Sequence, residues 1–389
     1  MKNSNLDIIN QFLHESALIQ TTHDDFKLFL GPLEAINNFQ QAFDANRTLL
    51  HKPEFWDFLQ PEKKSACFFS STRVLDLKRD DLLNILKTQN SKEGLEKQID
   101  WQQPDYNSFS RQYEWVQEKI KKGYLLKGLP ITYQSGQSSC SHLIFYSLQF
   151  VLENSINSTE QNHQRAAEFI YAYWKNGQGF IGQTPEVLLE AHEQSVETMA
   201  LAGTWKKNSD VVNFEDVKIQ QEHQFVVDDV KKQMQSFQLK EQKPTAVAEL
   251  KHLYHLKTEL NYKLLPSQSV FEVSQQLHPT AALGLYPRKK PQFQEFSLLP
   301  LQAERKNFGA PFGFFSKEKS FLVVAIRNFY FSKLKSKNSS EADDRYLLEI
   351  FSGCGVTIDS QIDVEWQELI AKRESVKKNM GLQVSGLGL

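Results

Sequence analysis

The sequence is poor in cysteine, and this restricts the classes of protein it can belong to. Its 389 residues include only three cysteines, Cys67, Cys140 and Cys354, which lie far apart along the chain. Three such cysteines build neither a disulfide framework nor a zinc cluster. A small disulfide-stapled secreted fold is therefore excluded, and a reducing compartment is expected.

Long apolar runs and an excess of one charge are also missing. No apolar segment reaches the roughly 20 residues that a membrane-spanning helix needs. The first residues, MKNSNLDIINQFLHES, lack the uninterrupted apolar stretch of a signal peptide. The net charge is only −2, so no overall basic field attracts nucleic acid or an anionic membrane. We therefore expect a cytoplasmic protein that binds neither.

The chain does contain enough apolar residues for a sizeable core, since 40% of its residues are hydrophobic and 12% are aromatic. No shift in composition marks a linker between domains. We predict one compact domain over residues 1–389, with an N-terminal α/β part at 1–104 and a core at 105–383. No coiled-coil pattern is visible, so a monomer is expected, with a dimer as the alternative.

Hydrophobic periodicity indicates the order of helices and strands. Helices are predicted over 105–122, 214–238 and 361–380. Residues 168–207 are typical of several antiparallel strands separated by Gly and Thr-Pro turns, and 308–331 of a hairpin. This mixture predicts an α+β fold of two stacked, mainly antiparallel sheets flanked by helices, in α/β/β/α layers.

Arg327 is the single charge in the apolar run FLVVAIRNFYF (321–331). Such a run is typical of a buried strand, where a guanidinium is costly unless an anion meets it. Arg327 is therefore either an edge-strand arginine whose head reaches solvent or a bidentate clamp for a carboxylate. Gly353-Cys354-Gly355, after the next strand, is either a plain turn or a place where backbone N–H groups approach an anion.

Three glutamates offer hard oxygen atoms that suit a metal. Glu222 lies one helical turn before Val226, on the apolar face of its helix. Glu365 and Glu368 are three residues apart and project from the same side of the final helix. Oxygen ligands without histidine or cysteine favour Mg²⁺ over zinc. The alternatives are a carboxylate held by the helix dipole at Glu222 and a solvated charged face, with Lys372 as the partner of Glu368.

Three further side chains are candidates for catalysis. Lys127 interrupts the apolar segment LLKGL and is either a buried base or an edge charge. Glu186, in QTPEVLL, stands at a turn that enters a strand and is unremarkable alone. His278, in LHPTAAL, is more often a hydrogen-bonded structural histidine than a catalyst.

Taken in order, a series of segments resembles the chorismate-binding enzyme family, whose members include isochorismate synthase, salicylate synthase, anthranilate synthase component I and aminodeoxychorismate synthase. The resemblance covers roughly 105–383 and implies the anthranilate synthase component I / aminodeoxychorismate synthase-like fold, with chorismate as substrate. The matching segments are IKKGYLLKG, IGQTPEVLL, ALAGTWKK, KIQQEHQFVVDDV, LHPTAALGLYPR, RKNFGAPFGF, VVAIRNF, FSGCGVTIDS and VEWQELIAK.

The resemblance also implies roles for the chemically active residues. In the branch that adds water to the chorismate ring at C2 as the C4 hydroxyl leaves, Lys127 matches the general base and Glu186 the general acid. Glu222 and Glu368 match direct ligands of Mg²⁺, which holds the ring carboxylate. Glu365 matches a carboxylate that reaches the metal through water.

A second set of matching residues is expected to hold the substrate. Arg327 matches the arginine that grips the carboxylate of the enolpyruvyl ether, and Lys372 matches a lysine near the ring carboxylate. The other matches belong to the AGT, HPT and glycine segments of the family and are expected to line the site: Ala202, Gly203, Thr204, His278, Thr280, Gly353 and Gly355.

Three features favour the isochorismate synthase branch, which is an isomerase by outcome. Lys127 stands where anthranilate synthase commonly has a glutamine, and Ala202 where aminodeoxychorismate synthase typically has a nucleophilic lysine. LHPTAAL resembles the isochorismate synthase pattern, in a form closer to the menaquinone pathway than to the siderophore pathway. Salicylate synthase and a paralogue that binds chorismate without converting it are the alternatives.

Four positions depart from the family pattern, and two of them, Ile219 and Phe308, bear directly on the site. The other two are Trp205, which follows the AGT segment, and Pro130, which interrupts the strand after Lys127. Ile219 stands three residues before Glu222, where an acidic residue is usual, so one contact near the metal is in question. Phe308 replaces a common tyrosine and so removes a hydroxyl that could hydrogen-bond the substrate.

Overall fold

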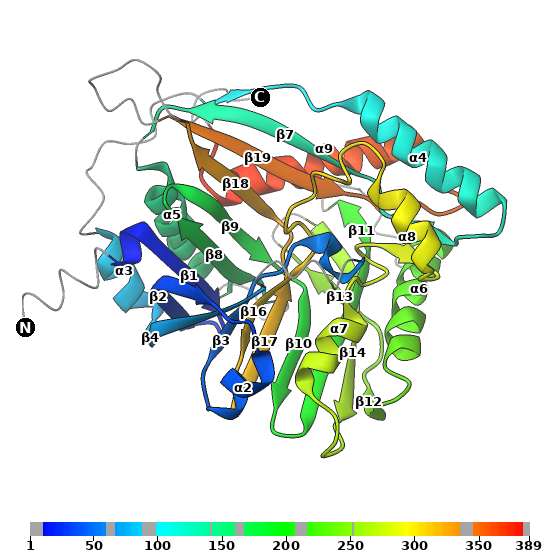
Figure 1. Ribbon diagram of the computed structural model, residues 1–389. Helices are drawn as coiled ribbons and strands as arrows, with labels where there is room; N and C mark the ends of the chain where they lie inside the picture. Colours follow the sequence, from blue (N-terminus) through cyan, green and yellow to red (C-terminus); the bar gives the residue numbers. More distant parts are fainter. Residues whose placement is uncertain are drawn as a thin grey trace, which may run out of the picture.

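The fold is built around one continuous system of antiparallel strands (Figure 1). Among the residues that the structure describes, the strands form a 17-stranded network, and a separate two-stranded ladder joins β6 (Lys127–Gly128) to β15 (Leu285–Tyr286). The computed structural model describes residues 11–59, 67–87, 99–140, 142–159, 167–206, 216–250, 253–334 and 345–383.

Following the pairings from edge to edge shows that the network folds back on itself. One layer has the order β5-β7-β19-β18-β9-β8-β1-β2. The chain of pairs then turns through β4 and β3 into a second layer, β16-β17-β10-β11-β14, with β12 and β13 both on β14. The two stacked sheets predicted from the sequence are thus present, joined through β3 and β4 into one ribbon.

The strand bounds follow. The first layer contains β1 (Glu15–Gln20), β2 (Asp25–Ala35), β5 (Asp100–Trp101), β7 (Ile131–Ser138), β8 (Phe169–Lys175), β9 (Gln178–Thr184), β18 (Asn328–Lys333) and β19 (Tyr346–Gly353). The joining strands are β3 (Leu49–His51) and β4 (Phe68–Lys78). The second layer contains β10 (Val187–His192), β11 (Ser195–Lys206), β12 (Gln238–Gln242), β13 (Ala246–Glu249), β14 (Leu253–Lys263), β16 (Pro311–Phe315) and β17 (Lys319–Val324).

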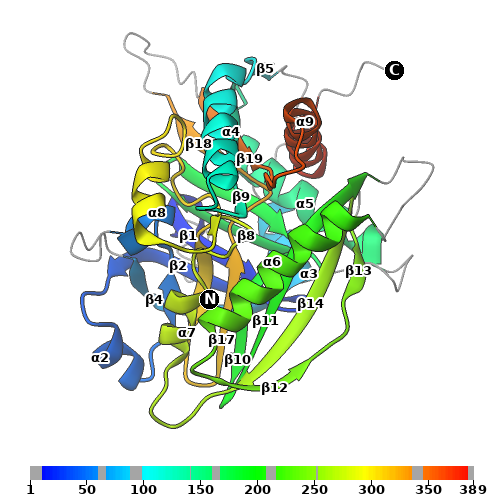
Figure 2. The same cartoon turned by 90° about the vertical axis from the view of Figure 1, so that its right-hand side faces the viewer.

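Helices cover the outer faces of both layers. On the first layer, α9 lies against β19, α4 against β7 and α5 against β9, whereas α6 covers β11 and β14 of the second layer (Figure 2). None of the described helices is long and apolar enough to cross a membrane. The helix bounds are α2 (Phe39–Asp44), α3 (Arg79–Lys87), α4 (Tyr106–Lys121), α5 (Leu143–Thr159), α6 (Val217–Gln233), α7 (Val270–Leu277), α8 (Lys290–Ser297) and α9 (Ile362–Asn379), with a 3₁₀ helix at Phe55–Leu59.

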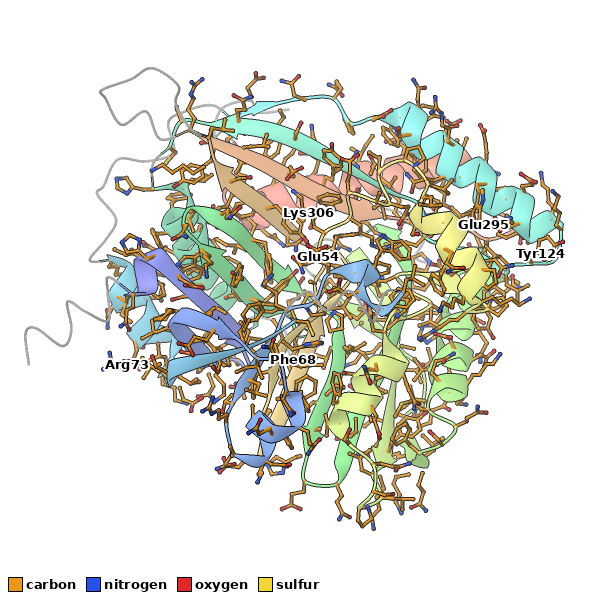
Figure 3. All side chains as sticks on the ribbon, in the orientation of Figure 1. Glu54, Phe68, Arg73, Tyr124, Glu295 and Lys306 are labelled. Atoms are coloured by element: carbon orange, nitrogen blue, oxygen red, sulfur yellow. The ribbon has the colours of Figure 1, made fainter. Side chains whose placement is uncertain are left out.

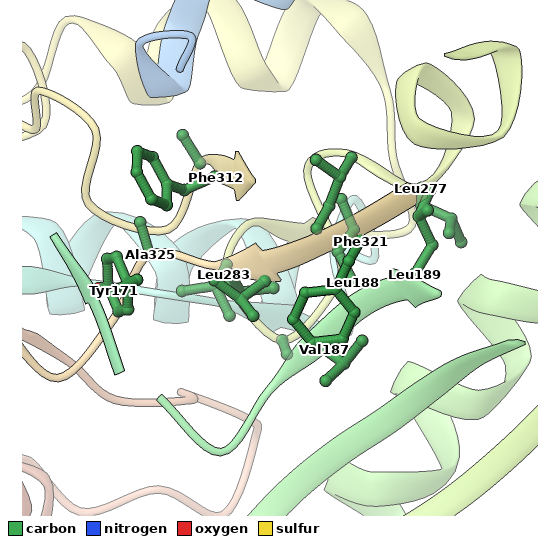
Figure 4. Packing of buried hydrophobic residues seen from close by; sticks show 14 of the residues in the cluster. Tyr171, Val187, Leu188, Leu189, Leu277, Leu283, Phe312, Phe321 and Ala325 are labelled. Carbon is green, nitrogen blue, oxygen red and sulfur yellow. The ribbon is translucent and has the colours of Figure 1, made fainter. Parts of the chain in front are cut away.

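The main core lies between the two layers. Tyr171 and Phe180 of the first layer contact Phe312 of the second, with ring centroids 5.5 and 5.3 Å apart. Figure 4 shows part of this core, with Phe321 and Val187 from the second layer. Strand β17 is buried over nearly its whole length, because it lies inside the second layer and faces the core. This explains why its sequence is a continuous apolar run rather than an alternating one.

Two smaller cores lie under the helices of the first layer. One is formed by α3, α5 and the strands they cover, and the other by α4, α8 and α9. At the outer end of α4, Lys119 forms an ion pair with Glu295 of α8 and lies over the ring of Tyr124. Figure 3 shows Glu295 and Tyr124 together at this end of the molecule.

Local signals in the sequence account for the starts of several helices, α4 and α6 among them. The helix predicted over 105–122 is α4, which begins after Asp105 because the Asp105 carboxylate accepts the Ser108 N–H. The helix predicted over 214–238 is α6, whose first residues are capped by Asp216 in the same way. The hairpin predicted over 308–331 is interrupted: β17 ends at Val324 and β18 begins at Asn328. Arg327 therefore lies in a turn and not, as the sequence suggested, in the middle of a strand.

Candidate active site

Most of the predicted site residues line one cavity, whose empty space is about 700 Å³ including its open mouth. Its walls come from β6, the β9–β10 turn, β11, β14, α6, the β17–β18 turn, the end of β19 and α9. The predicted residues that line it are Lys127, Glu186, Ala202, Gly203, Thr204, Glu222, Arg327, Gly353, Gly355, Glu368 and Lys372.

Glu186 is a buried acid in the wall between the two layers. It follows β9 through Pro185 and directly precedes β10, and its carbonyl accepts the Val324 N–H at 2.9 Å. Burial raises the pKa of its carboxyl from 4.5 to about 8, although Lys127 and Lys372 oppose the rise. At neutral pH the side chain is therefore protonated and can give a proton to a bound molecule.

Lys127 is almost fully buried, with 1% of its surface exposed. Its Nζ donates to the carbonyl of Ala281 at 3.0 Å and lies 3.5 Å from the carbonyl of Ala282. Glu222 Oε1 is also 3.5 Å from this nitrogen. The amine is thus held in a fixed position on the cavity wall, as a group that takes a proton from substrate or water must be.

Gly355 allows Lys127 and Glu222 to approach each other. A Cβ at position 355 would lie 2.0 Å from Glu222 Oε1 and 2.7 Å from Lys127 Cε. Any other residue would push at least one of these side chains away. The close packing of these two side chains therefore requires glycine at position 355, a reason that differs from both readings left open by the sequence.

Each of the three predicted metal-binding carboxylates has a lysine beside it. Lys127 is near Glu222, as described, and Lys372 Nζ lies 2.6 Å from Glu368 Oε1. Lys218 Nζ lies 2.9 Å from Glu365 Oε1. Burial raises the pKa of Glu365, and the neighbouring carboxylate of Glu368 adds to this rise while Lys218 opposes it. Negative charge is therefore concentrated here and is balanced by internal ammonium groups.

Arg327 reaches the cavity from the turn between β17 and β18. Its backbone is left-handed, with φ of 57°, which is strained for a residue with a side chain. Its carbonyl accepts the Gln183 N–H at 3.2 Å, which holds the turn against β9. Burial lowers the pKa of the guanidinium, with Glu168 and Glu368 opposing. A carboxylate that entered the cavity would offset this cost of burying a cation.

The AGT segment enters the cavity through a bulge in β11. The register of β11 against β14 shifts between Ala202 and Thr204, and Gly203 has φ of 77°. A Cβ at 203 would also lie 2.5 Å from Ile219 Cγ2. The bulge turns Ala202, Gly203 and Thr204 towards the cavity, because a glycine adopts this conformation without strain.

His255 lines the same wall and was not identified from the sequence. Its Nδ1 lies 3.1 Å from the Gly203 carbonyl and 3.2 Å from Thr204 Oγ1. Burial lowers the pKa of His255 to about 3, and Arg327 and Lys372 add to this effect, so the ring is neutral at pH 7. His255 lies on the same face of β14 as Lys257 and Glu259, because residues two apart on a strand share a face. This pattern predicts an exposed side chain, yet His255 is buried beside the bulge in β11 and lines the cavity.

Three predicted site residues do not line the cavity. His278 and Thr280 were expected to line it and are corrected here, whereas Glu365 was expected to reach the metal only through water. The Nε2–H of His278 donates to the backbone carbonyl of Phe55 at 2.9 Å, and the imidazole contacts the Phe55 ring, so His278 has structural contacts outside the cavity. Thr280 is buried beside it. The HPT segment instead reaches the cavity through Ala282 and Leu283, the latter shown in Figure 4. Glu365 lies behind the cavity wall, in its ion pair with Lys218.

The two departures from the family pattern that bear directly on the site have different consequences. Ile219 fills the space beside Gly203 and offers no oxygen to a metal. Phe308 lines the cavity, and its ring is stacked on Phe351 with centroids 5.7 Å apart. Both positions are therefore apolar contacts in this chain.

The residues present fit a Mg²⁺ ion by the chemistry of their donors. Glu222 and Glu368 line one cavity, and together with Glu365 they act on the same buried thiol, raising the pKa of Cys354 after the larger effect of burial. In the part of the chain that the structure describes, no three His, Cys, Asp or Glu side chains form a metal cluster by themselves. Mg²⁺ usually takes only one or two carboxylates and completes its shell with water and substrate oxygens.

Comparison with known proteins identifies the family of the chain that forms this cavity. Residues 70–381 match the family described as "Chorismate binding enzyme". The chain belongs to the chorismate-binding enzyme family. The match begins before residue 105, so family membership extends into the N-terminal part, further than the sequence motifs indicated.

Curated relatives of this family member include isochorismate synthases. One from Bacillus subtilis is 27% identical over 227 residues, and a salicylate biosynthesis isochorismate synthase from Pseudomonas aeruginosa is 26% identical over 226 residues. Each alignment covers 55% of this chain, but 45% and 44% of the relative. The chain therefore spans about half the length of the curated relatives it matches. Anthranilate synthase component 1 from Aeropyrum pernix is 24% identical over 237 residues, which are 56% of this chain and 50% of the relative.

Solved structures confirm the fold of this chorismate-binding family member. The menaquinone-specific isochorismate synthase of Escherichia coli superposes with a TM-score of 0.71 at 17% identity, covering 96% of this chain and 90% of that one. Anthranilate synthase component I of Streptococcus pneumoniae gives a TM-score of 0.65 at 14% identity, covering 93% and 92%. At these identities the likeness establishes the fold alone, and this is the fold class predicted from the sequence.

Proposed function

We propose that this protein is an isochorismate synthase, which converts chorismate to isochorismate in the presence of Mg²⁺. The observation that carries the proposal is the pairing of two groups in one cavity. The amine of Lys127 is fixed there by a backbone carbonyl, in a position that suits the proposed base. Glu186 is buried, which raises its pKa to about 8 and suits the proposed acid. The names of the curated relatives from Bacillus subtilis and Pseudomonas aeruginosa support the same reaction.

The proposed reaction is a displacement with an allylic shift. Lys127 takes a proton from water as the water oxygen bonds to C2 of the ring. Both ring double bonds shift, from C1=C2 and C5=C6 to C1=C6 and C4=C5, as the bond from C4 to its hydroxyl oxygen breaks. Glu186 gives its proton to that oxygen, which leaves as water. One water enters and one leaves, so the product is an isomer of chorismate. Lys127 then loses its proton to solvent and Glu186 regains one.

The charges of the cavity suit the substrate. Chorismate carries two carboxylates, and Arg327 and Lys372 provide fixed positive charges on different walls. Glu222 and Glu368 would hold the Mg²⁺, with Glu365 behind them. When bound, the ion supplies positive charge that neutralises the ring carboxylate. His255 is neutral beside Arg327 and Lys372, so it adds no positive charge of its own to the cavity.

The test is an analysis of the products formed from chorismate by the purified protein with Mg²⁺, with and without ammonium, by chromatography with mass detection. A product isomeric with chorismate and independent of ammonium would support the proposal. Salicylate with pyruvate would assign the protein to the salicylate synthase branch. A product that requires ammonium, or unchanged chorismate, would contradict the proposal.

A further inference from the structure

Asp229 is a fully buried carboxylate that the reaction described above does not use. It lies on α6, two helical turns after Glu222 and on the same face of the helix. It does not line the cavity. A buried charge of this kind is costly unless other groups pair with it.

Arg288 meets Asp229 from the segment that follows α7. Its Nε lies 2.9 Å from each carboxylate oxygen of Asp229, and its Nη2 lies 2.5 Å from Oδ2. The same guanidinium donates to the carbonyls of Gln276 at 2.8 Å and Leu277 at 3.0 Å, at the end of α7. One arginine thus fastens the end of α7 to α6.

The Asp229 carboxylate also reaches the backbone that holds Lys127. Its Oδ2 accepts the Ala281 N–H at 3.1 Å. The carbonyl of Ala281 in turn accepts from Lys127 Nζ at 3.0 Å, and that of Ala282 lies at 3.5 Å. The peptide groups on both sides of Ala281 are therefore fixed, one by Asp229 and the other by the amine of Lys127.

The surroundings of the Lys127 amine consequently depend on one helix. Glu222 acts on the amine directly from α6, at 3.5 Å, and Asp229 acts on it from the same helix through Ala281. The backbone of Lys127 also pairs with the chain that follows Ala281 and Ala282, because β6 pairs with β15 and Tyr286 lies opposite Lys127.

We propose that Asp229 and Arg288 are positioning residues for Lys127: their ion pair fixes the Ala281 and Ala282 carbonyls that hold the lysine amine at the point where it takes a proton from water. The inference rests on the proposed role of Lys127 as general base. It predicts that loss of the ion pair affects the chemical step and not substrate binding, because neither residue touches the cavity.

The experiment is a double-mutant cycle that combines Asp229→Asn with Lys127→Ala. Asp229→Asn keeps the shape and one oxygen acceptor but removes the charge that Arg288 requires. A displacement of about 1 Å at a catalytic group costs up to about a hundredfold in rate. We therefore expect Asp229→Asn alone to lower kcat about tenfold to a hundredfold with little change in KM. In the Lys127→Ala background the same substitution should change the residual kcat less than about twofold.

The matched control is Asp228→Asn, the same chemical change at the exposed neighbouring position on α6. It should leave kcat and KM unchanged. Arg288→Lys keeps the positive charge but loses the bidentate geometry, and it replaces Asp229→Asn in the cycle if that variant does not fold, as judged by circular dichroism and thermal unfolding. It should show the same loss of kcat and the same lack of effect without Lys127.

Two results would overturn the inference, and they are distinguishable. Equal losses of kcat with and without Lys127 would mean that Asp229 acts through the fold in general, while the proposed function stands. Full activity of Lys127→Ala alone would remove Lys127 from the proposed function and the positioning role with it.

Discussion

The cavity contains carboxylates in two contrasting settings. Glu186 is buried in a wall where the two nearest lysines only partly offset the cost of ionisation, and its pKa is about 8. Glu222 and Glu368 line the same cavity and are partly exposed. Glu222 lies 3.5 Å from the Lys127 nitrogen and Glu368 lies 2.6 Å from the Lys372 nitrogen. Burial favours the neutral carboxyl of Glu186, which suits its proposed role as proton donor. The partly exposed carboxyl oxygens of Glu222 and Glu368 suit their proposed role as ligands of a cation.

The strongest way to break this comparison is to remove the proton donor. Glu186→Gln keeps the size and polarity of the side chain but cannot give a proton to the departing hydroxyl, so kcat should fall about 10²- to 10⁴-fold. Product formation from chorismate measures this loss. Glu190→Gln, on the adjacent strand β10 and paired with Lys319 outside the cavity, is the matched control and should retain activity. Full activity in Glu186→Gln would remove this residue from its proposed role.

The second setting consists of Glu222 and Glu368, the carboxylates beside Lys127 and Lys372. Substitution of Glu368 should change the affinity of the protein for metal. Glu368→Gln replaces a carboxylate donor by an amide and removes the ion pair with Lys372. Binding of Mn²⁺, used as a spectroscopic substitute for Mg²⁺, should therefore weaken at least about tenfold. Electron paramagnetic resonance of free Mn²⁺ gives the affinity directly. Glu374→Gln, on the same helix and paired with Lys377, is the control. Equal affinities in the two variants, or turnover that persists in excess chelator, would contradict the metal assignment.

The two settings also differ in how far the sequence predicted them. The carboxylates proposed to bind metal gave a partial pattern, since spacing on a helix places Glu365 and Glu368 on one side. That spacing alone is also typical of a solvated charged face. Glu186 gave none, because a single glutamate at a turn is common; only the family resemblance indicated it. Its raised pKa arises from two layers that close over it, and a sequence does not reveal which side chains such a closure buries.

The histidines of the chain illustrate the same limit. His278 belongs to a motif of the family but faces Phe55, while Ala281 and Ala282 of that motif bind Lys127 through backbone carbonyls, which side-chain patterns do not predict. His255 lies on the polar face of β14 and is buried only where β11 bulges. The helices α4 and α6 were predictable because Asp105 and Asp216 cap them locally.

Raising the pH should sharpen the contrast by turning the proton donor into a charged carboxylate. Because the pKa of Glu186 is raised to about 8, its protonated form is lost as the pH rises through that value. We expect kcat/KM to fall about tenfold per pH unit above pH 8, as a single required acid dictates. A pH profile with Mg²⁺ held constant measures this. A rate that stays level from pH 7 to pH 10 would contradict the assignment of Glu186 as the acid.

The smallest expected effect is on the free energy of unfolding. Its pH dependence reports the burial of Glu186 independently of any catalytic role. In the unfolded chain the carboxyl loses its proton near pH 4.5, whereas in the folded chain it keeps it up to about pH 8. Between these values the folded state binds more protons, so this group's contribution to stability is full below pH 4.5 and is lost as the pH rises to 8. Each unit of pKa shift corresponds to about 1.4 kcal/mol.

Glu186→Gln cannot ionise, so its free energy of unfolding relative to the wild type should rise across this range by a few kcal/mol and then stay constant above pH 8. Urea unfolding at a series of pH values, without Mg²⁺ or substrate, measures the difference. Glu190→Gln should show no such rise, because that carboxylate is half exposed and paired with Lys319. A constant difference between Glu186→Gln and the wild type would mean that Glu186 is ionised in the folded protein. The contrast between Glu186 and the carboxylates Glu222 and Glu368 would then disappear.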